Sequence, residues 1–122
     1  MARGRDKHQA YQRAVQLLGK TLMRRSQRQC ELSGEQGQLV IYDLEDPREE
    51  PSLEEVLHVS IEMRDRLKGG KLNPSKLRCL ETAVWSEHTP VRRAAVILLK
   101  RIDESWAREA LDSAMMMGDL EG

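Results

Sequence analysis

The chain has 122 residues, of which 33% are charged and 39% hydrophobic, enough for one small domain with a limited core. No apolar run approaches the roughly 20 residues that cross a bilayer, which excludes a membrane-spanning helix. Basic and acidic side chains number 20 each, yet they are separated along the chain. Residues 1–30 carry eight basic side chains and one acidic one, whereas residues 31–66 carry three basic and eleven acidic ones.

The first expected element is a helix over residues 6–28. Its apolar positions recur with the 3.6-residue period of a helix: Tyr11, Ala14, Val15, Leu18 and Leu22. Most basic side chains fall on the other faces, and five of them form the candidate binding surface: Arg13, Lys20, Arg24, Arg25 and Arg28. Such a surface could meet an acidic protein, the phosphates of a nucleic acid, or the acidic segment that follows it in the chain. Protein or internal partners are favoured over nucleic acid.

A turn at residues 33–37 followed by the β-branched and aromatic run 39–42 predicts a small β-hairpin near residues 30–42. A second helix is predicted over residues 52–67. Ser52 and Glu55 have the spacing of a capping box, apolar residues follow at helical spacing, and Gly69 with Gly70 ends the segment.

Three more helices are expected in the second half of the chain. One begins at Asn73-Pro74 and runs towards Trp85, the next begins at Thr89-Pro90, and the last runs from about Trp106 to Met115. The predicted fold is mainly α within the α+β class, with about five helices in a single domain over residues 1–122. Both tryptophans are expected to anchor the core.

No residue pattern predicts catalysis. His8, His58 and His88 lie in three different segments without metal-binding or catalytic spacing, and phosphate-loop and nucleophile-elbow motifs are absent. The methionine run at residues 115–117 is expected to end an amphipathic helix against the core, with a docking face as the alternative. Two cysteines without an apolar leader are typical of a reduced, cytoplasmic protein.

Eight short segments follow one another along nearly the whole chain: Arg3–Ala10, Leu18–Lys20, Arg24-Arg25, Cys30–Leu32, Arg78–Glu87, Pro90-Val91, Leu99–Arg101 and Trp106–Leu111. Together they resemble PhnA-like proteins, the family named after the alkylphosphonate-utilisation operon. The resemblance implies a basic helix and a zinc-ribbon-like module over residues 1–67, followed by a helical segment over residues 71–117. Longer relatives carry a further small β-barrel-like domain, which this chain is expected to lack.

The family's zinc module uses two Cys-x-x-Cys pairs. Here Cys30 stands at the first ligand position, Ser33 at the second, and Ser60 and Met63 at the other pair. A hydroxyl and a thioether do not replace thiolates on zinc, so the ribbon is expected to be degenerate, with no metal or other cofactor. Met63 would then fill part of the vacated space. A rescued site of Cys30, Cys79 and His58 is the remaining alternative.

The expected function is therefore that of a non-enzymatic accessory that binds another protein and no membrane. Nucleic-acid binding through the basic helix is the alternative. A phosphonate-related hydrolase, an activity with which the family has been labelled, is the weaker alternative because the thiolate positions are vacant.

Overall fold

The computed structural model describes residues 3–45 and 52–116. Helices provide most of the regular structure, together with one antiparallel pair of strands, which confirms the mainly α, α+β class. The elements in chain order are α1 (Arg3–Ser26), β1 (Leu39–Asp43), β2 (Val56–Ser60), α2 (Ile61–Leu67), the 3₁₀ turn η1 (Pro74–Lys76), α3 (Leu80–Ala83), α4 (Thr89–Leu99) and α5 (Ser105–Met116).

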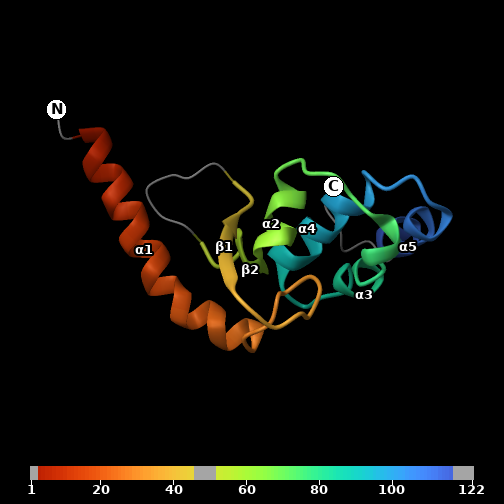
Figure 1. Cartoon of the computed structure of the whole chain (residues 1–122), viewed down its shortest axis with the longest axis horizontal. Helices are drawn as coiled ribbons and strands as arrows, with labels where there is room; N and C mark the ends of the chain where they lie inside the picture. Colours follow the sequence, from red (N-terminus) through yellow and green to blue (C-terminus); the bar gives the residue numbers. More distant parts are fainter. Residues whose placement is uncertain (1–2, 46–51, 117–122) are drawn as a thin grey trace.

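The first helix meets the rest of the molecule at its C-terminal end, and its N-terminal half extends away from the body (Figure 1). Leu22 and Ser26, in the last two turns, are buried, and α1 packs against β2. The helix ends in a Schellman motif, in which the Arg28 amide donates to the Met23 carbonyl at 3.2 Å and the Gln27 amide to the Arg24 carbonyl at 3.3 Å. Gln27 and Arg28 have φ angles of 56° and 62°, the left-handed conformation.

The predicted strand at residues 39–42 is present as β1, and its partner is β2. Leu39 pairs with Ser60, Ile41 with His58 and Asp43 with Val56. Residues 29–36 contribute a single bridge between Gln29 and Gln36. The two paired strands are therefore joined by a much longer connection than the small hairpin predicted near residues 30–42 would have.

The helix predicted over residues 52–67 is wrong in its first half, where β2 runs. Four consecutive residues of β2, 56–59, are buried, so both faces of the strand are covered, which helical spacing cannot reveal. The Ser52 hydroxyl accepts the Glu54 amide at 3.1 Å and caps a turn rather than a helix. The helix begins at Ile61 instead, because the Ser60 hydroxyl accepts the Met63 amide at 3.2 Å.

The third predicted helix is divided into η1 and α3. Asn73 caps the first turn as expected, but Leu77 has φ −115° and ψ 15°, outside the helical range, and this break leaves both Leu77 and Leu80 fully buried. The fourth and fifth predicted helices are confirmed as α4 and α5.

The core lies around α4, which packs against α2, α3, α5 and β2. Seven of its eleven residues are buried. Cys30, Leu32 and Met63 from the first half of the chain belong to the same buried cluster as α4 and Ala107 of α5. Side chains from both predicted halves thus share one core.

The two tryptophans differ. Trp106 is partly buried against the core, with the Arg78 guanidinium 4.8 Å from its ring centre. Trp85 is 50% exposed, so the prediction that it anchors the core is wrong. It follows the short helix α3, and Val84 beside it occupies the buried position instead.

Across residues 3–45 and 52–116, none of the helices combines the length and the apolar character needed to cross a bilayer.

Candidate interaction surface

The four positions at which the PhnA-like resemblance implies zinc ligands each have a structural role. Cys30 and Met63 are buried in the same apolar cluster, at 2% and 1% exposure. The Ser60 hydroxyl caps α2, and the Ser33 hydroxyl accepts the Glu35 amide at 3.3 Å. In the described part of the chain, no group of three or more His, Cys, Asp or Glu side chains could hold a metal ion.

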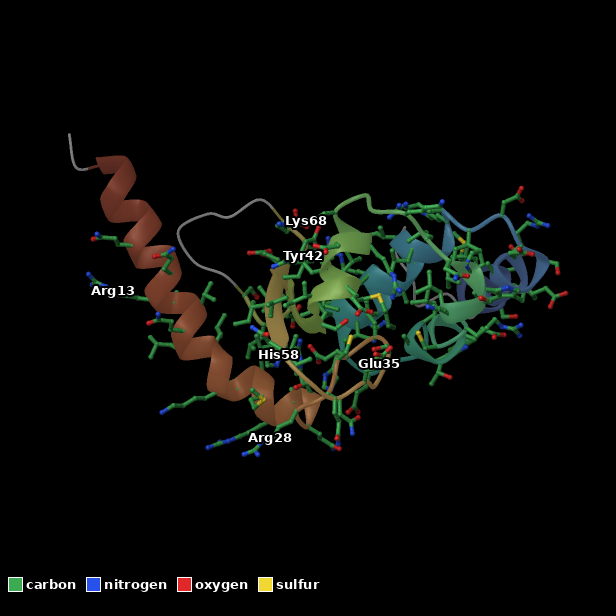
Figure 2. All side chains as sticks on the ribbon, viewed as in Figure 1. Arg13, Arg28, Glu35, Tyr42, His58 and Lys68 are labelled. Atoms are coloured by element: carbon green, nitrogen blue, oxygen red, sulfur yellow. The ribbon has the colours of Figure 1, made fainter. Side chains whose placement is uncertain are left out.

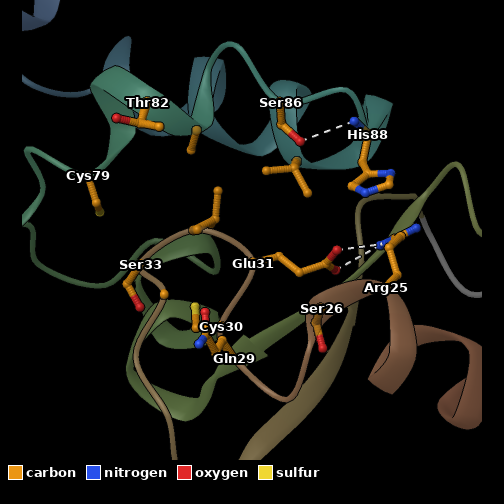
Figure 3. Close-up of a pocket in the computed structure, with 14 residues that line it drawn as sticks. Arg25, Ser26, Gln29, Cys30, Glu31, Ser33, Cys79, Thr82, Ser86 and His88 are labelled. Atoms are coloured by element: carbon orange, nitrogen blue, oxygen red, sulfur yellow. Dashed lines mark hydrogen bonds and ion pairs between the residues drawn. The ribbon is translucent and has the colours of Figure 1, made fainter.

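Cys30 and Cys79 line a groove of about 520 Å³ between the turn after α1 and the segment from α3 to α4 (Figure 3). Both are free thiols. Burial raises the pKa of the half-buried Cys79 thiol, and the nearby Cys30 adds to the rise. A raised pKa keeps Cys79 in the thiol form, the less reactive one.

His58, the third member of the alternative metal set, is buried against α1. Its Nδ1 lies 3.3 Å from the Ser26 hydroxyl, and its backbone amide donates to Glu31 Oε1 at 2.7 Å. Burial lowers the pKa of the imidazole, partly opposed by the Glu31 carboxylate and assisted by Arg25. The ring is thus neutral at pH 7 and serves the packing of α1 on β2.

Arg25 belongs to the interior and not to an exposed surface. Its guanidinium donates to both oxygens of Glu31, at 2.7 and 2.8 Å (Figure 3). It also donates to the carbonyls of Leu53 and Val56, each at 2.8 Å. The side chains of Arg25 and Glu31 are 12% and 4% exposed. One residue of the basic helix thus pairs with the acidic segment that follows it, which was one of the three partners considered from the sequence.

The other four candidate cations remain exposed: Arg13, Lys20, Arg24 and Arg28. Figure 2 shows Arg13 of α1, and Arg28 in the turn that follows the helix, projecting away from β1 and β2. Within residues 3–45 and 52–116, none of the four forms an ion pair.

Leu17 is the residue that sequence reasoning missed. It is 79% exposed and lies off the apolar stripe of α1. At 3.6 residues per turn, Arg13, Leu17, Lys20 and Arg24 fall within about 60° of one another around the helix axis. These four residues are called the basic face below. The sequence feature that could have identified Leu17 is that this leucine lies outside the 3.6-residue apolar period of its helix.

The remaining candidates give little chemistry. His88 is half-buried, 3.6 Å from Glu87, and its backbone amide donates to the Ser86 hydroxyl (Figure 3). The side chain of His8 and the residue Met117 lie outside what the structure describes.

Met115 and Met116 are 48% and 86% exposed, which contradicts their expected packing on the core, because Ala114 takes the inward position at the end of α5.

Comparisons of the chain with protein-family models, with curated proteins and with solved structures find no significant match.

Proposed function

We propose that this protein is a non-enzymatic, cytoplasmic accessory that binds an acidic protein through the basic face of α1. The observation that supports this most is Leu17, 79% exposed, in the middle of three exposed cations. An isolated exposed leucine needs no explanation. Leu17 is instead surrounded by cations that form no ion pair within residues 3–45 and 52–116, and together they make a mixed apolar and cationic surface.

The dimensions suit one helix or strand of a partner. At 1.5 Å per residue, Arg13 and Arg24 lie about 16 Å apart along the helix. A matching surface would present an apolar contact for Leu17 with carboxylates on either side of it. The cations would steer the encounter and orient the partner, while burial of Leu17 would supply apolar stabilisation.

The apolar component favours protein over nucleic acid. Phosphate contacts require only cations and hydrogen-bond donors, so they would leave Leu17 in water. Met23, 39% exposed, adds apolar surface on the same helix. Few aromatic side chains accompany them, since the whole chain has two tryptophans, two tyrosines and no phenylalanine.

We also propose that the chain is a PhnA-like protein with a degenerate zinc ribbon. Two observations support this. Cys30 opens a tight turn in which the Gly34 amide donates to its carbonyl at 2.8 Å, and Ser60 opens α2. One pair of positions therefore stands at a tight turn and the other at the first turn of α2, and Cys30 and Met63 lie in one cluster.

The test of binding uses a fluorescent amphipathic peptide of glutamate and leucine, followed by anisotropy at low salt. Leu17→Ala should weaken binding about tenfold, because a buried leucine loses most of its contact area. Lys20→Gln should weaken it less and reduce its dependence on salt. Met116→Ala and Lys100→Gln, which change exposed residues on other elements, are the matched controls.

A peptide of scrambled sequence but equal composition should bind more weakly than the amphipathic one. Equal binding of the two peptides would contradict a specific face. Tighter binding of a single-stranded RNA of equal charge, unchanged by Leu17→Ala, would favour the nucleic-acid alternative over the proposal.

A further inference from the structure

A shallow hollow of about 460 Å³ lies at the C-terminal end of α1. Its lining consists of three cations and two uncharged side chains: Lys20, Arg24, Arg28, Met23 and Gln27. Among residues 3–45 and 52–116, no acidic side chain lines it. The hollow continues the basic face, with which it shares Lys20 and Arg24.

The end of the helix brings the three cations together. Lys20 and Arg24 are one turn apart, a spacing at which like charges repel. The Schellman motif then reverses the chain, and the bond from the Arg28 amide to the Met23 carbonyl returns Arg28 to the same end of the helix. The hollow thus carries a charge of +3, well above the roughly half negative charge of a helix C-terminus.

The backbone at this hollow is strained. Gln27 and Arg28 both adopt left-handed conformations, at φ 56° and 62°, although glycine is the residue that a Schellman motif prefers after its last helical residue. Strained non-glycine residues are concentrated at functional sites, where side chains are needed despite the cost. The same two residues supply a guanidinium and an amide to the lining of the hollow.

We infer that this hollow binds a phosphoserine or phosphothreonine of the acidic partner. The inference rests on the proposed function, since it names a group on the protein that the basic face would bind. A phosphate monoester carries close to two negative charges and three acceptor oxygens at pH 7. Two guanidiniums and an ammonium match that charge, and a guanidinium can hold two phosphate oxygens at once. One carboxylate would neutralise a single cation of the three.

The direct test is a titration of the full chain with O-phosphoserine, with serine as the control, followed by the shifts of backbone amide signals. Saturable shifts at residues 20–28, with millimolar affinity, are expected for phosphoserine and not for serine. Arg28→Gly should weaken this binding about tenfold, the effect of losing one charge-assisted contact. Gln27→Gly removes the same kind of backbone strain, retains all three cations, and should change the affinity at most about twofold.

The absence of saturable shifts at these amides would overturn the inference, as would equal losses in Arg28→Gly and Gln27→Gly. A second titration uses the glutamate–leucine peptide with and without one phosphoserine near its end. Tighter binding of the phosphorylated form that disappears in Arg28→Gly supports the inference. Equal binding of both peptides overturns it while leaving the proposed function intact, whereas loss of peptide binding with retained phosphoserine binding contradicts only the proposed function.

An RNA arm separates phosphopeptide from nucleic acid. If a short single-stranded RNA competes for the hollow more strongly than the phosphorylated peptide, and Arg13→Gln weakens RNA binding as much as Arg28→Gly, the phosphopeptide inference is overturned. Preference for the phosphorylated peptide supports it.

Discussion

The carboxylate of Glu31 accepts two hydrogen bonds from the guanidinium of Arg25, at 2.7 and 2.8 Å, and a third from the backbone amide of His58 at 2.7 Å. One buried carboxylate therefore connects the last turn of α1 with β2. Arg25 also donates to the carbonyls of Leu53 and Val56, which ties α1 to the chain that enters the strand.

Replacing Arg25 by glutamine should destabilise the fold by about 3–5 kcal/mol, because it leaves Glu31 buried without its counter-charge. Urea unfolding followed by circular dichroism measures the change. Arg24→Gln, at the exposed neighbouring position, is the control and should stay within about 0.5 kcal/mol of the parent. Equal effects of the two substitutions would show that the Arg25–Glu31 pair contributes nothing to stability.

Stability should fall as the pH drops below the ordinary histidine pKa of 6.5, because His58 has a lowered pKa in the folded state. The unfolded chain takes up the proton at a higher pH than the folded chain does, so protonation favours unfolding. The contribution of neutral His58 to the free energy of unfolding is complete above pH 6.5, and it is lost as the pH falls from there towards the lowered pKa of the folded state. Thermal melts over this range should show a smaller decline for His58→Gln, and an identical decline would assign the effect to other groups.

Gln27→Gly and Arg28→Gly should each stabilise the protein by about 1 kcal/mol, since glycine adopts the left-handed conformation without steric cost. A higher melting temperature for both variants is the expected result. Lys20→Gly, inside α1, is the contrasting substitution and should destabilise by a similar amount. A lower melting temperature for Arg28→Gly would mean that its side chain contributes more to the fold than its backbone strain removes.

A strong chelator should leave the melting temperature unchanged, and elemental analysis should find no stoichiometric zinc. Met63→Ala should in contrast cost about 2–5 kcal/mol, because Met63 is 1% exposed within the core cluster. Met116→Ala, at 86% exposure, is the matched control. A melting temperature lowered by the chelator would revive a metal site at or near Cys30.

Local pattern was sufficient for α1, α4 and α5, whose apolar residues follow the helical period over at least three turns. It failed at residues 52–60, because Leu53, Val56 and Leu57 have helical spacing, while Val56 and Leu57 fit a strand covered on both faces equally well. The pairing of Ile41 with His58 decides between the two, and this pairing is long-range. The capping spacing at Ser52 was present, but it formed a turn.

The candidate surface was predictable only as a set of residues. In the sequence, Arg24 and Arg25 are equivalent neighbours, yet one is exposed and the other is held inside by Glu31. That difference depends on how the turn after α1 folds back, which composition does not encode. Glycine and asparagine are the residues that normally mark a left-handed position at a helix end, and neither occurs at 27 or 28. The left-handed conformation of Gln27 and Arg28 was therefore likewise not predictable.

The two ends of α1 should differ in hydrogen exchange. Leu22 and Ser26 are buried in its last two turns, so their amides should exchange only when the whole fold opens. Around Arg13, where the side chains are exposed or half-buried, exchange should proceed through local fraying of a helix that depends largely on its own propensity. A partner on the basic face would therefore slow exchange near Arg13 by suppressing this fraying, and would slow exchange at Leu22 only by the amount by which its binding stabilises the whole fold.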